Sequence, residues 1–379
     1  MTYLTNTGFE SGVEIELFDA QGTRSIQTTI KRTGAYAART NPTTTATGFY
    51  GIRHGEGIVS VSLNAATLYS RIYCYIATLP AANSEELISI HTGTGYKFIV
   101  RVTSGGLLQA YAADGTTQLG SNGTTALSIN TWYRIDVKVG TGASAAWEIR
   151  IGGLSELSGT ANLGGTNAAS LYVGKVTNRN GNSVDYYWDD VAIRDDDYPS
   201  DGAVKIMKPS ADGNYTTWTI GAGAGDKWQQ IDEVTHDSNT TYLLSTGTIG
   251  QAYTAALEST TTAGIAGPIN GSRMMLIVAR NSAGAAILTR IRSSSTDSDG
   301  ISNTLGAAYA VISRLAATDP ATGVAWTAGG LDGAEVGAVE NATTTQSRLT
   351  AAYMMVDEGV PLAANAMGAV VRSPMWGTY

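Results

Sequence analysis

Alternation of apolar and charged residues is the feature that most constrains how this chain can fold. In residues 132–139, every odd position from 133 carries an apolar or aromatic side chain, while positions 134, 136 and 138 are charged. Residues 96–102 show a similar apolar pattern and end at a Ser-Gly-Gly turn, and residues 107–111 lead to Asp114-Gly115, a dipeptide typical of hairpins. A period of two predicts antiparallel strands with one buried face.

Composition supports an all-β chain. Glycine accounts for 45 of 379 residues, and only 15% of residues are charged while 43% are hydrophobic. Many short strands joined by tight turns fit this mixture, and no long amphipathic pattern predicts a helix. The formal net charge is −8, which argues against a protein that binds nucleic acid through its phosphates. We expect tandem antiparallel β-sandwiches of jelly-roll type.

The chain divides near residue 200. An acidic, turn-rich stretch at 195–202 separates a closing strand at 186–193 from a new strand at 204–207. We predict a first domain over 1–201, a second β-sandwich domain over 202–359 and an extended C-terminal tail over 360–379. A Gly-containing strand, a polar loop and a final strand occur at 171–191 and again at 335–357, which favours one sandwich design used twice.

The sequence shows no pattern typical of a targeting signal. The N-terminal segment lacks a basic stretch followed by an apolar one, so we expect no signal peptide, synthesis in a cytoplasm and no membrane segment. Cys74 is the single cysteine, which excludes an intrachain disulfide framework. Alternation places Cys74 with Ile72 and Ile76, as a buried side chain.

The strongest catalytic candidate is the segment Glu14-Ile15-Glu16. Alternation would place Glu14 and Glu16 on one face of a strand, and the segment is similar to the Glu-x-Asp-x-x-Glu pattern of jelly-roll glucanases, in which paired carboxylates cleave glycosidic bonds. The residue types at the second and third positions are swapped, and no aromatic-rich strand adjoins the segment. We therefore expect solvated acids on an exposed strand face.

Other patterns carry little chemistry. His54, His91 and His236 are isolated and have no cysteine or acidic companion at zinc-ligand spacing. The glycine-rich residues 221–227 lack the Ser or Thr that follows the lysine of a phosphate loop. Tyrosine (19) and tryptophan (7) outnumber phenylalanine (4), which suits half-wet surfaces that stack sugars or contact proteins.

The two ends of the first domain carry a family resemblance. Asn6-Thr7-Gly8-Phe9-Glu10-Ser11-Gly12 and Trp188-Asp189-Asp190-Val191-Ala192-Ile193 resemble the first and last strands of concanavalin-A-like and carbohydrate-binding jelly rolls. The resemblance implies that these strands pair. It also implies a structural calcium ion, for which Glu10, Asp189 and Asp190 would be the ligands.

A second resemblance lies in the second domain. Stretches that recur in structural proteins of tailed bacteriophages are similar to two parts of this domain: residues 319–327 with Leu331 and residues 335–337, and residues 232–234 with Asp237 and residues 240–242. This resemblance implies a virion component.

These observations together favour a non-enzymatic structural protein of a tailed phage particle, either a capsid decoration or a fibre or tail-associated protein. Its expected partners are major capsid or tail proteins and further copies of itself. We expect it to bind neither nucleic acid nor a membrane. The alternative is a lectin-like adhesion protein that binds a host-surface glycan with the N-terminal jelly roll. A third hypothesis, a glycan-cleaving enzyme, would depend on Glu14 and Glu16.

Overall fold

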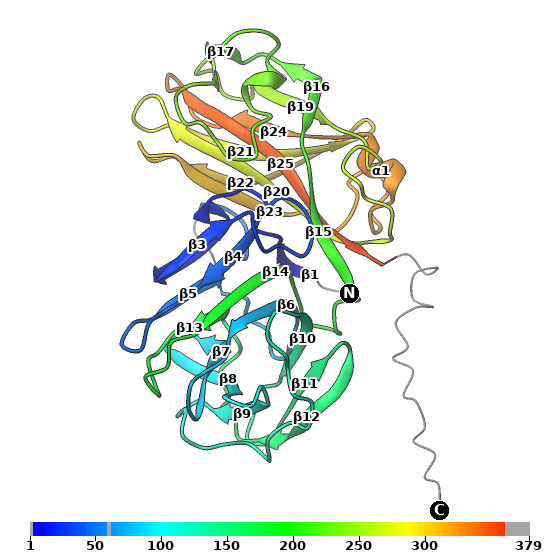
Figure 1. Cartoon of the computed structure of the whole chain (residues 1–379). Helices are drawn as coiled ribbons and strands as arrows, with labels where there is room; N and C mark the ends of the chain where they lie inside the picture. Colours follow the sequence, from blue (N-terminus) through cyan, green and yellow to red (C-terminus); the bar gives the residue numbers. More distant parts are fainter. Residues whose placement is uncertain (1–2, 59–61, 361–379) are drawn as a thin grey trace, which may run out of the picture.

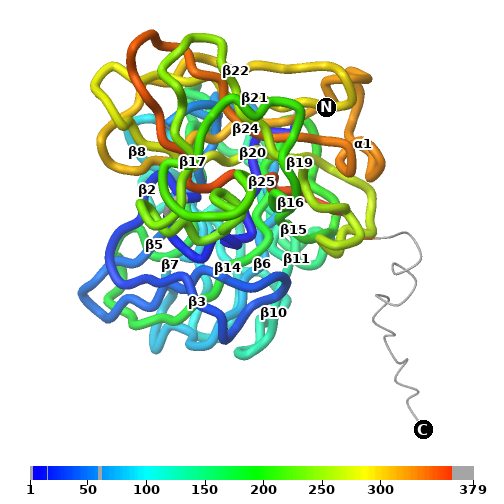
Figure 2. The backbone as a smooth tube through the Cα atoms, turned by 90° about the horizontal axis from the view of Figure 1, so that it is seen from above, coloured from blue at the N-terminus to red at the C-terminus, as the bar shows by residue number. Residues whose placement is uncertain are grey.

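The computed structural model describes residues 3–58 and 62–360 and shows a molecule built almost entirely from β-strands (Figure 1). Four antiparallel sheets pair into two sandwiches, which are stacked along the long axis of the molecule (Figures 1 and 2). Helical structure in this part of the chain is limited to two 3₁₀ turns, Glu14–Glu16 and Trp228–Gln230, and to α1 (Ala328–Asp332). The prediction of an all-β fold of antiparallel sandwiches is confirmed.

The first sandwich consists of strands β1 to β14. One sheet has the order β12 (Leu154–Ala161), β11 (Ala145–Ile151), β10 (Trp132–Val139), β6 (Leu68–Thr78), β14 (Asp185–Arg194), β4 (Ala37–Thr40) and β3 (Arg24–Gln27), with β1 (Tyr3–Thr7) also paired to β14. The facing sheet has the order β2 (Leu17–Gly22), β5 (Gly48–Ile52), β13 (Ser170–Lys175), β7 (Ser84–Thr92), β8 (Gly95–Thr103) and β9 (Leu108–Ala112).

The second sandwich consists of strands β15 to β25. One sheet has the order β17 (Thr219–Ala222), β18 (Tyr242–Leu244), β25 (Ser347–Gly359), β20 (Ile269–Arg280) and β23 (Ala310–Leu315), with β15 (Gly202–Met207) also paired to β25. The other has the order β16 (Pro209–Thr216), β19 (Ala252–Leu257), β24 (Ala334–Glu340), β21 (Ala286–Ser293) and β22 (Thr296–Thr304).

Side-chain alternation explains how the first core forms. Ile135, Val137 and Val139 of β10 are fully buried, and β10 pairs with β6 so that Ile135 lies opposite Ile72. Cys74 is buried on the same strand, as the alternation predicts. Each sandwich thus buries the apolar face of two sheets against each other.

The pairing of the first and last strands is also as expected. In β1 and β14, Thr7 lies opposite Val191, and Tyr3 lies opposite Arg194. The two similar strand pairs noted in the sequence, β13 with β14 and β24 with β25, each place one strand in each sheet of their sandwich. The segment predicted as an extended tail lies outside the described residues apart from Val360.

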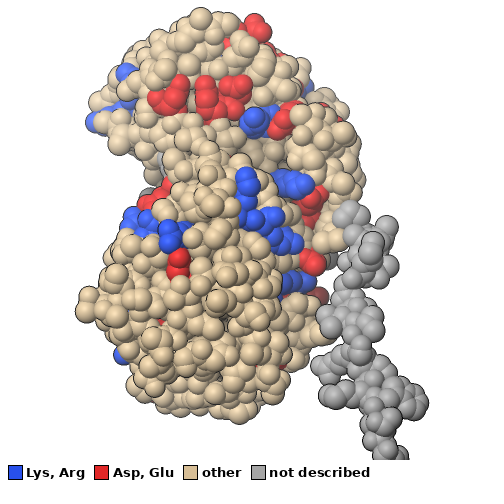
Figure 3. All heavy atoms as spheres, in the orientation of Figure 1, with Lys and Arg blue, Asp and Glu red and all other residues tan. Residues whose placement is uncertain are grey.

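The two sandwiches meet through polar residues as well as apolar ones. The segment before residue 58 reaches the second sandwich, where Gly57 forms an isolated bridge with Ser313 and Ile58 packs against the second core. On the face shown in Figure 3, charged side chains gather near this junction, and most of the first sandwich shows uncharged atoms.

No helix in residues 3–58 and 62–360 has the length and apolar character needed to span a membrane.

Candidate functional site

An aromatic ring from each strand of one sheet defines the candidate site. The sheet runs β2-β5-β13-β7-β8-β9, and these side chains lie on its outer face, away from the core. We call them the ring track; in strand order they are Phe18, Phe49, Tyr172, His91, Tyr96 and Tyr111. Five of the six rings are partly exposed, whereas Phe49 is buried. Alternation within each strand directs the neighbouring residues into the core.

Irregularities in the strands bring some of these rings outward. The pairing of β7 with β8 shifts between Ile90 and His91, so that Ile90 lies opposite Phe98 in the core while His91 lies opposite Tyr96 on the outer face. A similar shift in β2 leaves Phe18 beside Gly51 of β5. Such bulges are a common means of redirecting a side chain.

The rings contact one another across the strands. The ring centroid of His91 lies 4.3 Å from that of Tyr96 and 4.5 Å from that of Tyr172. Tyr172 in turn packs edge-on against Phe18 at 5.4 Å and against Phe49 at 5.6 Å. Gly51 makes this packing possible, because a Cβ atom at that position would lie 2.7 Å from the Phe18 ring and 3.0 Å from Tyr172.

A cavity of about 480 Å³ opens at the β9 end of the ring track. Its lining includes Arg101 and Tyr111 from β8 and β9, Gly115 from the turn after β9, and Thr177, Asn178 and Arg179 from the loop between β13 and β14. The Arg101 guanidinium lies 3.9 Å from the centroid of the Tyr111 ring, and the Arg179 guanidinium lies 4.7 Å from that of Tyr96. Cation–π contact therefore holds both guanidinium groups beside the cavity.

A buried carboxyl group lies behind the two arginines. Glu86 is opposite Arg101 in the β7–β8 pairing, and its Oε2 atom accepts hydrogen bonds from the Thr177 amide at 3.2 Å and the Tyr96 hydroxyl at 3.4 Å. The Arg179 Nε atom is 4.0 Å from the same oxygen. Burial raises the pKa of Glu86 to about 7, although the amide and the arginines oppose the shift. Glu86 therefore titrates near neutral pH.

His91 behaves differently. Burial lowers its pKa to about 4, and Arg179 contributes in the same direction. One ring nitrogen lies 3.0 Å from the Ser89 hydroxyl. At neutral pH the imidazole is therefore an uncharged ring that completes the ring track. His91 is isolated in the sequence because its ring partner Tyr172 comes from a strand distant in the chain.

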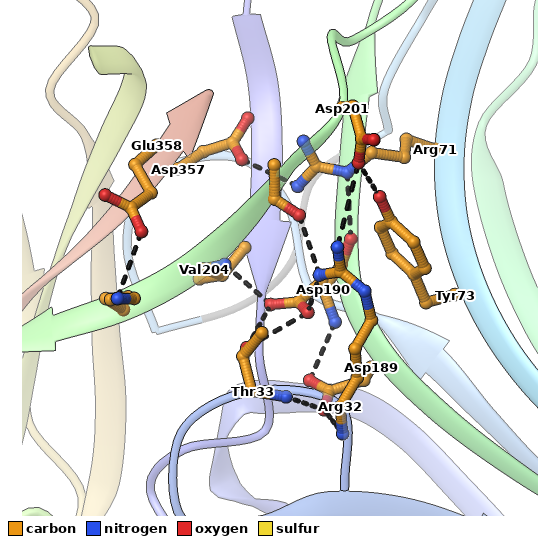
Figure 4. Close-up of polar contacts among 12 residues, drawn as sticks. Arg32, Thr33, Arg71, Tyr73, Asp189, Asp190, Asp201, Val204, Asp357 and Glu358 are labelled. Carbon is orange, nitrogen blue, oxygen red and sulfur yellow. Dashed lines mark hydrogen bonds and ion pairs between the residues drawn. The ribbon is translucent and has the colours of Figure 1, made fainter. Parts of the chain in front are cut away.

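Asp189 and Asp190, two of the residues predicted to bind calcium, lie side by side near the junction (Figure 4), and Glu10 is close enough to interact with both electrostatically. Each of the three has other partners. The Asp189 Oδ2 atom accepts hydrogen bonds from the Arg32 and Thr33 amides, and Asp190 pairs with the Arg32 guanidinium at 2.6 Å. Glu10 accepts a hydrogen bond from the Ala35 amide at 2.7 Å.

Burial and nearby charges shift the pKa values of the Glu10 and Asp189 carboxyl groups. Within residues 3–58 and 62–360, no three acidic, histidine or cysteine side chains are arranged to hold a metal ion. Burial raises the pKa of Glu10 to about 8, and Asp190 adds to the shift. Burial and the neighbouring Asp190 also raise the pKa of Asp189 well above its usual range. Calcium binding by Glu10, Asp189 and Asp190 stays a prediction.

The prediction that Glu14 and Glu16 are solvated acids on an exposed strand face is wrong. These residues form a 3₁₀ turn before β2, not a strand, so their side chains do not share a face. Glu16 is fully buried and accepts hydrogen bonds from the Thr7 hydroxyl and the Ser11 amide, whereas Glu14 pairs with Arg24 at 2.8 Å. The two carboxylates are therefore not solvated acids on one face of a strand.

Comparisons with known proteins find similarity in structure alone. No family model matches the chain, and no curated protein matches it. Among solved structures, the cellulose-induced protein Cip1 is 13% identical, with a TM-score of 0.38, and the match covers 50% of this chain and 97% of that one. An endo-β-1,4-glucuronan lyase from the fungus Trichoderma reesei is 13% identical, with a TM-score of 0.34, over 46% of this chain and 88% of that one. A carbohydrate esterase from the Shiga toxin-encoding bacteriophage phi24B is 16% identical, with a TM-score of 0.37, over 50% of this chain and 98% of that one.

The similar structures thus include carbohydrate-active jelly-roll sandwiches. The lyase and the esterase, together with alginate lyases that also match, are enzymes. The prediction that the chain is not an enzyme is therefore corrected: it rested on the lack of recognisable catalytic groups in the sequence, and the similar structures include enzymes. A fold alone does not specify a reaction, because the function depends on the residues of the site.

Proposed function

We propose that the N-terminal sandwich binds a glycan chain laid across the ring track. The observation that carries the proposal is the alignment of one ring on each of six neighbouring strands. Strands in a sheet lie about 4.8 Å apart, so six strands span roughly 24 Å, enough for a short oligosaccharide. Sugar rings present apolar C–H faces, and partly exposed aromatic rings suit them because each ring has an apolar face and, in tyrosine and histidine, a polar edge.

Polar groups beside the rings would supply the hydrogen bonds that a sugar needs. The exposed side chains of Thr116, Asn178 and Asn180 line the cavity at the β9 end of the ring track. A concave site with aromatic walls and a few directed polar groups is typical of ligand-binding surfaces. This combination supports a glycan over a wholly apolar ligand.

Binding measurements on the Tyr172→Ala variant test the proposal. Tyr172 contacts three other rings of the track, so its loss should weaken binding of a glycan identified by array screening about tenfold, as measured by isothermal titration calorimetry. The matched control is Tyr69→Ala, which removes a partly exposed tyrosine that packs on Tyr198 at 5.1 Å and belongs to the other sheet. The control should bind like the wild type. Absence of glycan binding by the wild type, or equal losses in both variants, would contradict the proposal.

The expectations about location and partners stay predictions. A place in a tailed-phage particle, contacts with capsid or tail proteins and self-association rest on the sequence resemblance. A host-surface glycan as partner is the use that this proposal assigns to the ring track. Mass spectrometry of purified particles would test the virion location directly.

A further inference from the structure

We propose that the cavity between Arg101 and Arg179 is the subsite of the ring track for an anionic group of the glycan, either a carboxylate or a sulfate ester. This inference rests on the proposed glycan binding and adds the class of sugar. The two arginines come from different segments, β8 and the loop between β13 and β14, and both line the cavity. Their convergence is therefore a property of the fold and not of neighbouring positions in the sequence.

Both guanidinium groups retain hydrogen-bonding capacity. Each lies over an aromatic ring, which occupies its face and leaves its edge for hydrogen bonds. The Nε atoms of Arg101 and Arg179 are buried and have no hydrogen-bond partner within the described part of the chain, although one terminal nitrogen of Arg101 donates to the Gly115 carbonyl. A planar fork of donors suits the oxygens of a carboxylate or a sulfate.

The acidic side chains nearby do not neutralise both arginines. Glu86 is the carboxyl group 4.0 Å from Arg179. Glu85, next to it in the chain, is paired with the buried Lys175 at 3.4 Å. Asp114, in the turn beside the cavity, accepts hydrogen bonds from the Thr116 and Thr117 amides, both at 2.8 Å. Two guanidinium groups thus share one carboxyl group, which leaves positive charge at the cavity of a chain whose net charge is −8.

Gly115 maintains the position of the Arg179 guanidinium. Its φ of +65° lies in the left-handed region, and a Cβ atom at this position would lie 2.1 Å from the Nη1 atom of Arg179. The turn after β9 therefore needs glycine both for its backbone conformation and for space. The same close approach brings the Gly115 carbonyl to Arg101, so one residue fixes the spacing of the two cations.

A neutral sugar would fit this cavity less well than an acidic one. Placing an uncharged ligand there would bury partly unpaired guanidinium groups, and hydrogen bonds to charged groups are the ones whose loss costs most. Tyr111 and Tyr96, which support the arginines, belong to the ring track. An acidic unit would thus occupy the cavity while the neighbouring units lie across the other rings.

The test compares three oligosaccharides of equal length with the full chain by calorimetry: an oligogalacturonate, a sulfated galactan fragment and a neutral cello-oligosaccharide. We expect at least one anionic ligand to bind about tenfold or more tightly than the neutral one, and Arg179→Gln to remove that advantage. Which of the two anionic ligands binds identifies the group. Arg348→Gln is the matched control, because Arg348 also lies over a tyrosine, 5.0 Å from the centroid of the Tyr242 ring, but in the second sandwich.

The outcomes separate the two proposals. Equal binding of neutral and anionic ligands, or wild-type affinity in Arg179→Gln, would overturn the anionic subsite while leaving glycan binding on the ring track intact. Binding of anionic ligands that is lost in Arg179→Gln but unchanged in Tyr172→Ala would support the subsite and contradict the track. Absence of binding by all three, and by a glycan array, would overturn both.

Discussion

The Arg71 guanidinium and the Asp357 carboxylate form an ion pair with an N–O distance of 2.6 Å, although 286 residues separate them in the chain. Both side chains are fully buried. Arg71 belongs to β6 of the first sandwich and Asp357 to β25 of the second, and Arg71 also donates to the Ser200 carbonyl at 2.7 Å in the connection between the sandwiches. The pair therefore fixes how the two halves meet (Figure 4).

Arg71→Met should strongly destabilise the protein, because it leaves the Asp357 carboxylate buried without its counter-charge. Removing one partner of a buried pair costs about 3–5 kcal/mol in the free energy of unfolding, measured by urea denaturation. Arg39→Met is the control, because Arg39 pairs with Asp185 at 2.8 Å but its side chain is 35% exposed. Loss of that pair should cost less than about 1 kcal/mol. Similar losses in both variants would contradict a structural role for the buried pair.

Gly51→Ala should weaken glycan binding, with some loss of stability because the added methyl group overpacks the site. A methyl group there would displace the rings of Phe18 and Tyr172 and break the ring track in its middle. We expect a several-fold rise in Kd, since contacts between rings contribute about 0.5–1.5 kcal/mol. Gly93→Ala is the control, because no atom lies within 4 Å of a Cβ atom at that position. An unchanged Kd in Gly51→Ala would argue that the ring track does not contact the ligand.

Glu10→Gln should change how stability depends on pH. The folded-state pKa of Glu10, about 8, lies above the usual value of 4.5, so the folded protein holds a proton that the unfolded chain releases. The stabilisation is fully present below about pH 4.5 and is lost as the pH rises to about 8. At about 1.4 kcal/mol for each pKa unit, the loss is at most a few kcal/mol. Thermal unfolding from pH 5 to 8 should show a shallower decline in the variant, and parallel curves would contradict the assignment.

The sequence was sufficient to predict the all-β class and several of the strands. Alternation in residues 132–139 identifies β10 and its buried face, because period-two burial is a local property of an extended chain. The same reasoning failed for Glu14 and Glu16, where the chain makes a 3₁₀ turn before the strand begins. Hydrogen bonds from Thr7 and Ser11 hold the Glu16 side chain in the protein interior. The alternation of residues along a strand cannot predict such contacts.

The ring track could not be predicted because it depends on strand order. Tyr172 and His91 become neighbours only because β13 pairs with β7, and Phe18 reaches Tyr172 only because β5 carries a glycine between them. A sequence signal did exist in the abundance of tyrosine, which fits half-wet surfaces. The contact of Glu86 with the arginines also depends on strand pairing, because Arg101 lies directly opposite Glu86 on the adjacent strand.

Affinity for an anionic glycan should rise as the pH falls through about 7. Glu86 has a pKa of about 7, so below this pH its carboxyl group is neutral and the two arginines lose their internal counter-charge. Two neighbouring groups do not titrate in this range, since His91 has a pKa of about 4 and Tyr96 has one of about 12. Removal of one charge near the ligand should strengthen binding between a few-fold and about tenfold from pH 8 to pH 6.

Glu86→Gln separates this effect from a general change in the protein. The variant should bind the anionic glycan at pH 8 as tightly as the wild type does at pH 6, and its affinity should stay constant between these values. A neutral glycan should show no pH dependence with either protein, because only a ligand charge senses the titration of Glu86. Calorimetry at pH 6, 7 and 8 distinguishes these cases. A wild-type affinity for the anionic ligand that is constant with pH, or a Glu86→Gln variant that keeps the full dependence, would show that the carboxyl group behind Arg101 and Arg179 does not control the cavity.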